Sequence, residues 1–199
     1  MDFTPAVLPL RASPPDAVLM MMLPPAAYIA MNQLYEQGVA PTARTWLYDG
    51  AGLGDYPDFW QNVKEAGKYM LEFALYHPQM NIPPIGKQVA EEYQRRTKNE
   101  PNRLIFQAAD SLLLLVDAIR EAKSTNADAM IKAMETMTFS GVRGTFKFSE
   151  EPGVSYHQWV DIPYVTYEFT EVGQPVSKTL LVEAPGMPLA VSKLVRPPK

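Results

Sequence analysis

The sequence has 199 residues, enough to bury a real core in one domain or in two small ones. Its 18 basic and 22 acidic side chains give a net charge of -4, which argues against a nucleic-acid-binding surface because phosphate recognition needs a basic face. The chain has no cysteine, which excludes disulfides, thiolate metal ligands and cysteine nucleophiles.

The amino-terminal residues predict a helix, a strand and a second helix. No basic region leads into an apolar run at the start, so we expect no signal peptide within this chain. Residues 5–12 predict a short helix, and the apolar run at residues 17–23 predicts a parallel strand buried on both faces. Pro24 and Pro25 suit the first turn of the next helix, which Gly38 ends. These prolines also interrupt the apolar stretch, which is shorter than the about 20 residues that cross a bilayer.

The same alternation then repeats. Residues 45–48 predict a strand, residues 49–54 a glycine-rich turn, residues 59–66 a helix and residues 68–76 another strand. Strands and helices that alternate over short connections indicate an α/β fold with a parallel sheet flanked by helices. Right-handed crossovers predict helices on both faces of that sheet.

The rest of the chain changes in character. Apolar residues at helical spacing predict a mainly helical middle section, and the last third favours strands. The expected helices cover residues 85–98, 104–119 and 127–137, and the expected strands cover residues 144–148, 162–169 and 179–182.

Several segments, in this order, resemble a known family. They are Asp2-Phe3-Thr4-Pro5 leading to Pro15-Asp16-Ala17-Val18, Tyr76-His77-Pro78 with Glu91-Glu92-Tyr93, Ala108-Ala109-Asp110-Ser111 with Asp117-Ala118-Ile119, and the stretch Phe139 to Ser149. Their order is similar to that in the later part of type I periplasmic solute-binding proteins of the branched-chain amino-acid (Leu/Ile/Val-binding) type, which serve ABC importers.

The resemblance implies parts of two α/β lobes joined by hinge crossovers. Residues 1–77 and 158–199 resemble the second lobe, and residues 78–157 resemble the closing, mostly helical part of the first lobe. The opening half of the first lobe has no counterpart, so we expect a truncated or split form that supplies one wall of the interlobe cleft.

The resemblance also implies a function that makes and breaks no bond. The lobes close on a small solute such as an amino acid, an amide or an aromatic acid, and membrane subunits of an ABC transporter recognise the closed form. The expected location of the full-length protein is periplasmic or extracellular. The alternative is a sensory module of a regulator or receptor with the same fold. A small α/β enzyme is a further alternative, for which no catalytic set is assembled.

Topology predicts the position of the ligand site. Open α/β sheets bind ligands at the carboxyl ends of their strands, which here are residues 22–24, 48–50 and 75–77. Tyr48 and Tyr76 are candidate aromatic walls at these ends. The alternative for both tyrosines is packing against the core of the lobe.

Asp49-Gly50 matches the acid–glycine step that, by the resemblance, pairs with a ligand ammonium group. A carboxylate in a closing cleft is a strong partner for a cation. The alternative is that Asp49 caps its own turn by accepting backbone hydrogen bonds.

Leu23 and Pro24 stand where amino-acid binders carry a tyrosine. This departure predicts a more apolar ligand, or a member that does not bind ordinary amino acids. The alternative is that Leu23 is the last buried residue of its strand.

Other chemistry has little support in the sequence. The glycine-rich turn lacks the dinucleotide fingerprint because Asp55 stands in the place of the third glycine. His77 and His157, the two histidines, have no metal-ligand spacing, and no serine lies in a G-x-S-x-G motif. We therefore expect no cofactor, no metal site and no hydrolase activity.

Overall fold

The computed structural model describes residues 1–198, which form two compact units. Unit 1 comprises residues 1–79 together with the described residues from Tyr164 onward, and unit 2 comprises Met80–Pro163. The chain therefore passes between the units at residues 79/80 and 163/164, where the sequence predicted 77/78 and 157/158.

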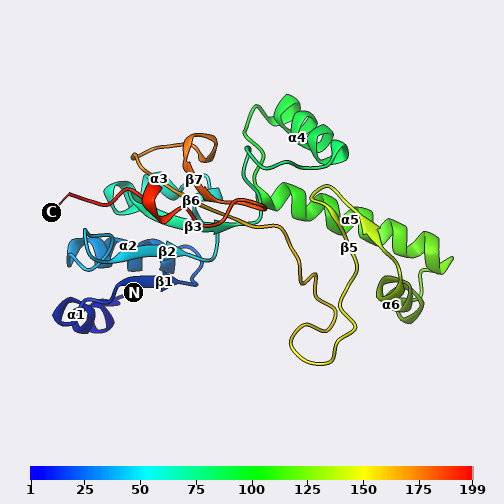
Figure 1. The fold of residues 1–199 in the computed structure, drawn as a ribbon, viewed down its shortest axis with the longest axis horizontal. Helices are drawn as coiled ribbons and strands as arrows, with labels where there is room; N and C mark the ends of the chain where they lie inside the picture. Colours follow the sequence, from blue (N-terminus) through cyan, green and yellow to red (C-terminus); the bar gives the residue numbers. More distant parts are fainter. Residues whose placement is uncertain (199) are drawn as a thin grey trace. The chain divides into compact units, whose positions relative to one another are not determined.

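Unit 1 is built on a mixed five-stranded sheet in the order β1-β2-β3-β6-β7 (Figure 1). The first three strands are parallel to one another, and β6 and β7 extend the sheet in antiparallel fashion. The strands are β1 (Ala17–Met20), β2 (Trp46–Asp49), β3 (Met70–Ala74), β6 (Val165–Glu168) and β7 (Leu180–Glu183). The observed sheet flanked by helices is the predicted α/β class.

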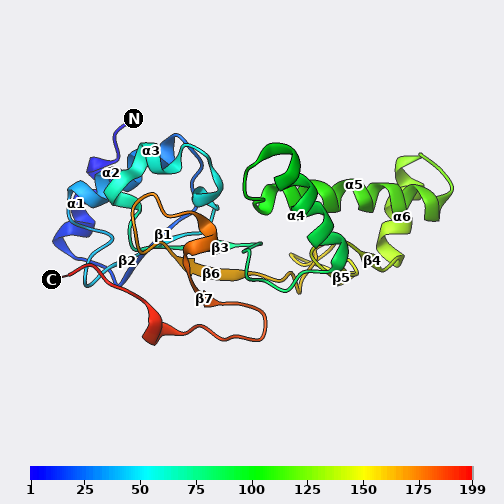
Figure 2. The ribbon, with the colours of Figure 1, turned by 90° about the horizontal axis from the view of Figure 1, so that it is seen from above.

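One face of this sheet, the helical face, carries the helices of unit 1 (Figure 2). Alternate strand residues point toward these helices, because successive side chains of a strand lie on opposite faces. The helices are α1 (Thr4–Ala12), α2 (Ala26–Glu36) and α3 (Phe59–Val63). Buried residues of this layer include Tyr28, Met31, Leu34, Leu47, Phe59, Met70, Tyr167 and Phe169.

The other side of the sheet, the second face, has no α-helix of the described part of unit 1 over it (Figure 2). The prediction of helices on both faces is therefore wrong for these residues. A segment that follows β7, the C-terminal strap of residues 184–198, crosses this face instead. The strap contains one short 3-10 turn, Val191–Lys193, and others lie at Leu53–Asp55, Lys64–Gly67 and Val176–Lys178.

The strand β1 lies at the edge of the sheet and is shorter than predicted. It ends at Met20 and pairs only with β2. Leu19 and Met21 are 63% and 69% exposed. The prediction that residues 17–23 form a strand buried on both faces is therefore wrong. A run of apolar residues indicates burial in the complete fold, but it does not say which elements provide the cover.

Unit 2 is mainly helical and ends in a short hairpin. Asn102 and Asn126 cap α5 and α6 by accepting backbone hydrogen bonds from Leu104 and Ala129. The elements are α4 (Pro84–Thr97), α5 (Arg103–Ala122), α6 (Ala127–Thr136), β4 (Phe139–Ser140) and β5 (Thr145–Phe146). The helices agree closely with the predicted ones because their apolar residues recur at helical spacing.

A buried ion pair joins α5 to this hairpin. Asp110 Oδ1 accepts a hydrogen bond from the Val142 backbone N–H at 2.6 Å, and Oδ2 accepts one from Arg143 Nε at 2.7 Å. Both side chains are at least nine-tenths buried. A side chain at Gly141 would overlap the Asp110 carboxylate, so the hairpin requires glycine at that position.

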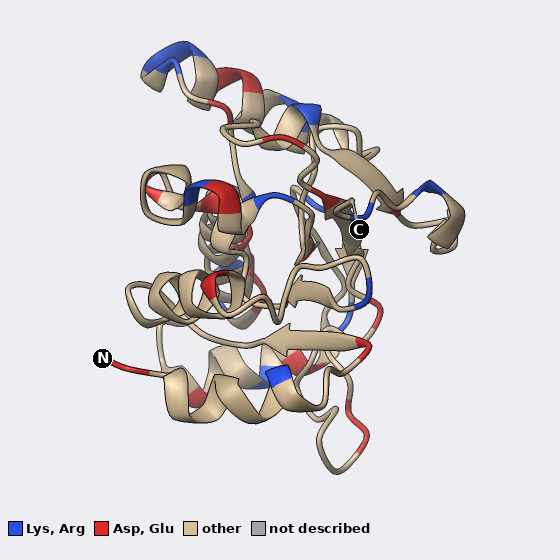
Figure 3. Cartoon of the chain, turned by 90° about the vertical axis from the view of Figure 1, so that its left-hand side faces the viewer, with Lys and Arg blue, Asp and Glu red and all other residues tan. Residues whose placement is uncertain are grey.

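Charged residues are distributed over both units (Figure 3). Short lysine and arginine stretches alternate with acidic ones along the chain. On α4, for example, Glu92 accepts hydrogen bonds from Arg95 and Arg96. None of the described helices has the length and apolarity needed to span a membrane.

Candidate functional site at the carboxyl edge of the sheet

The carboxyl ends of β1, β2 and β3 gather at one edge of unit 1, called here the carboxyl edge. The parallel register aligns Met20 with Asp49, and Asp49 with Glu72. The loops after β1 and β2 are in contact, because the Gly50 N–H donates to the Met20 carbonyl at 2.9 Å. A side chain at Gly50 would overlap the sulfur of Met21. The topology thus brings the loops that follow β1 and β2 together, as the sequence predicted.

Asp49 is completely buried at this edge and caps the turn that follows it. Its Oδ2 atom accepts hydrogen bonds from the backbone N–H groups of Gly52 and Leu53 at 2.7 and 2.8 Å. Its Oδ1 atom accepts one from Ala51 at 3.2 Å. The turn depends on Gly52, whose φ of 77° lies in the left-handed region. This geometry is that of the turn-capping alternative.

Glu72, on β3, also holds the turn after β2 by accepting one of its backbone hydrogen bonds. This role was not predicted from the sequence. The Oε2 atom of Glu72 accepts a hydrogen bond from the Gly54 N–H at 2.7 Å, and its Oε1 atom accepts one from the Tyr167 hydroxyl. Burial, and then the charges of Asp55 and Asp49, raise the pKa of Glu72 well above its ordinary value. The available signal was a single acid within an otherwise apolar strand, which indicates a buried and partnered carboxyl.

Leu23 and Pro24 follow β1 at the same edge. Leu23 is 62% exposed and Pro24 is half-buried. The alternative that Leu23 is the last buried residue of its strand is therefore wrong. The Leu23 carbonyl accepts the first hydrogen bond of α2, from the Ala27 N–H at 3.1 Å, so its backbone position is fixed. Met21, whose sulfur lies beside Gly50, is a second exposed apolar side chain of the same segment.

Tyr48 and Tyr76 present no exposed side chain beside Met21 and Leu23. Tyr48 points to the second face, where its hydroxyl lies 3.1 Å from Thr166 Oγ1 on β6. Burial raises its pKa. Tyr76 is only 7% exposed and belongs to the core. The alternation of strand residues explains Tyr48, since its neighbour Asp49 occupies the helical face.

His77 fixes the point at which the chain leaves unit 1. Its Nδ1 atom accepts a hydrogen bond from the Gln79 N–H, so Nε2 carries the hydrogen and donates to the Val176 carbonyl at 3.0 Å. The ring is completely buried and lies 5.3 Å from the ring of Tyr167. These contacts tie the end of β3 to the loop before β7, which is a structural role.

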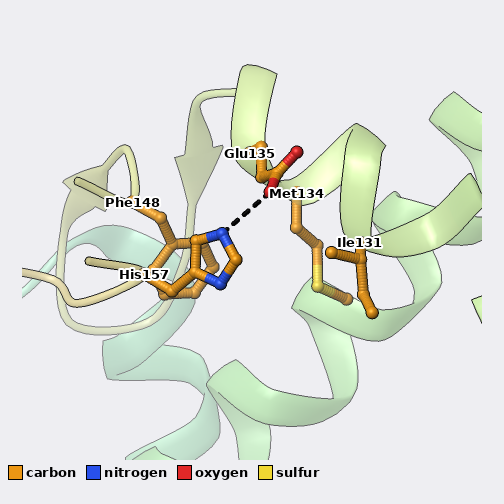
Figure 4. Close-up of a pocket in the computed structure, with 5 residues that line it drawn as sticks. All are labelled: Ile131, Met134, Glu135, Phe148 and His157. Carbon is orange, nitrogen blue, oxygen red and sulfur yellow. Dashed lines mark hydrogen bonds and ion pairs between the residues drawn. The ribbon is translucent and has the colours of Figure 1, made fainter. Parts of the chain in front are cut away.

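Unit 2 contains a small hollow of about 170 Å³ (Figure 4). It is lined by Ile131, Met134, Glu135, Phe148 and His157. Glu135 Oε1 lies 2.9 Å from His157 Nε2, and the Tyr156 hydroxyl donates to the same oxygen at 3.1 Å. The hollow has room for one small apolar group beside a carboxylate–imidazole pair.

The part of the chain that the structure describes contains no assembled metal site. There, no three side chains of the metal-ligating types His, Asp and Glu group closely enough to hold an ion. The acids of the carboxyl edge already accept backbone and hydroxyl hydrogen bonds.

A mixed α/β sheet whose chain passes twice to a second unit is an arrangement found in two-lobed solute-binding proteins. The family model described as periplasmic binding protein matches residues 1–160. This chain belongs to that family.

Solved structures have the same fold. A leucine-binding protein from Thermotoga maritima superposes with a TM-score of 0.74 at 21% identity, over 92% of this chain and 48% of that one. A branched-chain amino-acid binding protein from Streptococcus pneumoniae in complex with isoleucine gives 0.68 at 19% identity, over 91% and 48%.

A third structure is a solute-binding protein from R. palustris in complex with benzoate. It gives a TM-score of 0.65 at 16% identity, over 98% of this chain and 49% of that one. The chain thus spans about half the length of each of these structures. A search of curated protein sequences gave no match.

Proposed function

We propose that this chain provides one wall of the ligand cleft of a periplasmic solute-binding protein that serves an ABC importer. The carboxyl edge contacts a small organic solute, and closure of two lobes on that solute forms the state that the membrane subunits recognise. The working protein is periplasmic and captures its solute without chemical change. Family membership and the topology of unit 1 support this proposal.

One observation decides the class of solute that we propose. The segment after β1 exposes the apolar Met21 and Leu23, whereas the Asp49 carboxylate is buried and accepts three backbone hydrogen bonds. An ammonium group would have to leave water and enter the buried surroundings of a carboxylate that these bonds already hold inside its own turn, which carries a desolvation cost. This wall therefore favours the apolar body of an aromatic or branched carboxylic acid.

The proposal departs from the sequence expectation at Asp49, Tyr48 and Tyr76. Leu23, Pro24 and Gly50 remain proposed contact residues, and Met21 joins them. We leave Tyr48 and Tyr76 out of the proposed wall because neither side chain lies exposed at the carboxyl edge.

Methyl NMR on the methionine- and leucine-labelled chain tests the proposal with a matched pair of solutes. Phenylalanine and 3-phenylpropionate share an aromatic body and a carboxylate, and differ in the ammonium group. We expect both to shift the Met21 and Leu23 methyl signals, with 3-phenylpropionate at least as effective. The Leu23→Asp variant should lose the shifts, whereas Leu8→Asp, at an exposed leucine of α1, should retain them.

Two results would contradict the proposal. Shifts caused by phenylalanine alone, and abolished by Asp49→Asn, would restore ammonium recognition by Asp49. Shifts confined to unit 2, for example at Met134 in the small hollow, would move the site away from the carboxyl edge.

A further inference from the structure

The small hollow of unit 2 lies between α6 and the loop that follows β5. The helix contributes Ile131, Met134 and Glu135, and the loop contributes Phe148 and His157. Figure 4 shows Ile131 and Met134 on one side of the hollow and the rings of Phe148 and His157 on the other. Its volume of about 170 Å³ is close to that of a cavity of about 150 Å³ that accepts benzene, so a compact body of about five carbon atoms fits.

The loop that carries His157 is closed at its base by two backbone hydrogen bonds. The His157 N–H donates to the Ser149 carbonyl at 2.8 Å, and the Ser149 N–H donates to the Gln158 carbonyl at 3.0 Å. Inside the loop, the Tyr156 N–H donates to the Gly153 carbonyl at 3.2 Å. These bonds hold His157 at a φ of 59°, in the left-handed region that is uncommon for residues with a side chain. The loop therefore fixes the direction in which the imidazole points.

Both rings at the end of this loop converge on Glu135. Its Oε1 atom accepts a hydrogen bond from the Tyr156 hydroxyl at 3.1 Å and another from His157 Nε2 at 2.9 Å. The rings of Tyr156 and His157 stack, with their centroids 3.8 Å apart. Since both bonds go to Oε1, the Oε2 atom accepts none from the described residues. One oxygen of a fixed carboxylate at the hollow is thus available to a further donor.

The charges around the hollow favour a cation. The hydrogen bond to Glu135, and then the charges of Glu135 and Glu150, raise the pKa of Tyr156. Lys147 is already paired with Glu150 at 2.5 Å. Among the described residues, Glu135 has the imidazole as its partner and no lysine or arginine. Its side chain is 31% exposed, so an ammonium group reaches it without entering the core.

We propose that this hollow binds a small aliphatic amine. The ammonium group of the amine donates to Glu135, and its branched hydrocarbon body packs against Ile131, Met134 and Phe148. The ring of His157 forms one wall and holds the carboxylate in position. This site lies in unit 2 and selects a cation, whereas the carboxyl edge of unit 1 is proposed for an acid, so the inference does not rest on the proposed function.

Methyl NMR on the methionine-labelled 199-residue chain tests the proposal with three matched compounds. 3-Methylbutylammonium has both the charge and the branched body, 3-methylbutan-1-ol has the body alone, and methylammonium has the charge alone. We expect 3-methylbutylammonium to shift the Met134 methyl signal until it saturates. Each of the other two compounds lacks one contribution to binding and should bind at least about ten-fold more weakly.

Two variants locate the binding at Glu135. Glu135→Gln keeps an amide oxygen that accepts from Tyr156 but removes the charge, so the affinity for the amine should fall about ten-fold. Glu121→Gln, at an exposed acid of α5, is the matched control and should bind as the unmodified chain does. Ile131→Lys places an ammonium group one helical turn before Glu135, at a side chain that is 48% exposed. It should abolish binding of the amine and leave the urea midpoint unchanged.

Each other outcome overturns the proposal. Equal affinity for the alcohol means that the hollow recognises hydrocarbon alone, and equal affinity for methylammonium means that it attracts any small cation. Unchanged affinity in Glu135→Gln, or in Ile131→Lys with a normal urea midpoint, moves the amine away from this carboxylate. Shifts at Met21 in place of Met134 assign the amine to the carboxyl edge. If one variant fails to fold, the other variant and the three compounds decide.

Discussion

The two faces of the unit 1 sheet are made by the same strands but differ in almost every physical respect. The helical face is closed by α2 and α3, and its buried acids, Asp49 and Glu72, accept hydrogen bonds from neighbouring backbone and side-chain groups. The second face has an apolar cavity, an incomplete strap and a buried carboxyl with one unpartnered oxygen. The strands therefore carry residues suited to burial on both faces of the sheet, but the α-helices of the described part of unit 1 cover only one face.

The difference has an energetic consequence. Side chains on the helical face have lost their contact with water and are held by close packing, so removing them costs the transfer free energy and leaves a cavity. Side chains at the free edge of the second face, such as Leu19, remain partly in water, so removing them costs little in this chain. Four predictions test the comparison, in order of decreasing effect.

The largest effect is expected at Phe59 on the helical face. Its ring is 99% buried and lies within 5.6 Å, centroid to centroid, of the rings of Trp60 and Phe169. Phe59→Ala should lower the free energy of unfolding by about 3–5 kcal/mol, measured by urea denaturation. Leu19→Ala on the second face should change it by less than about 0.5 kcal/mol. Similar losses for both variants would remove the distinction between the faces.

The next effect concerns the cap at the carboxyl edge. Asp49→Ala removes the acceptor for three backbone N–H groups, two of which belong to the buried residues Gly52 and Leu53. We expect a loss of about 2–4 kcal/mol in the free energy of unfolding, and a smaller loss for Asp49→Asn because its amide oxygen still accepts. Glu36→Ala, at an exposed acid of α2, is the control. No loss in Asp49→Ala would reopen its ligand role.

A pH effect is expected at Glu168 on the second face. Burial raises its pKa from the ordinary 4.5 to about 7, against the opposing hydrogen bond from the Val195 N–H. Below pH 4.5 both the folded and unfolded states hold the proton, so this contribution to stability is fully present. Above pH 4.5 the unfolded state releases its proton while the folded state still binds one, so the contribution falls. It is lost as the pH rises through the folded-state pKa of about 7.

Urea denaturation between pH 4 and pH 8 measures this loss. Glu168→Gln cannot ionise, so the unfolding free energy of the variant should decline less than that of the unmodified chain, by about 1–2 kcal/mol. Glu72 changes stability in the same direction, since burial also raises its pKa, and it remains in both proteins. Identical pH profiles would show that Glu168 is not desolvated.

The smallest effect is expected for the strap. Arg196 donates to the carbonyls of Ala43 and Arg44 at 2.9 and 2.8 Å, and its guanidinium lies 3.7 Å from the centre of the Trp46 ring. Arg196→Ala should reduce the free energy of unfolding by less than about 1 kcal/mol. It should nevertheless speed hydrogen exchange at the Val195 N–H. Lys193→Ala, at an exposed lysine of the same strap, should leave that exchange rate unchanged.

The helices and strands could be predicted because their signals are local. The apolar stripe of α5, the asparagine caps at Asn102 and Asn126, and the prolines before α2 each depend on neighbours within a few residues. The parallel order of β1, β2 and β3 also followed, because short helices between strands permit few other arrangements.

The ligand role of the candidate site stays a prediction. That the ends of β1, β2 and β3 gather at one edge follows from topology, whereas the exposure of Leu23 was one of two alternatives that the sequence left open. The direction of the Asp49 side chain could not be predicted, because an acid before a glycine suits both a ligand and a turn. Tyr48 was assigned to the carboxyl edge because sequence position alone does not reveal which face of a strand a side chain occupies.

What the sequence by itself determined is the α/β class, the order of the elements and the edge of the sheet at which a solute is expected. Each of these depends on periodicity and on turn residues, which are local properties. What only the tertiary structure decided is which carboxyls are already bonded, that Glu72 supports the turn, and that the second face lacks helical cover. Those facts depend on contacts between residues far apart in the chain, such as Glu72 with Tyr167 and Glu168 with Val195, and no local pattern encodes them.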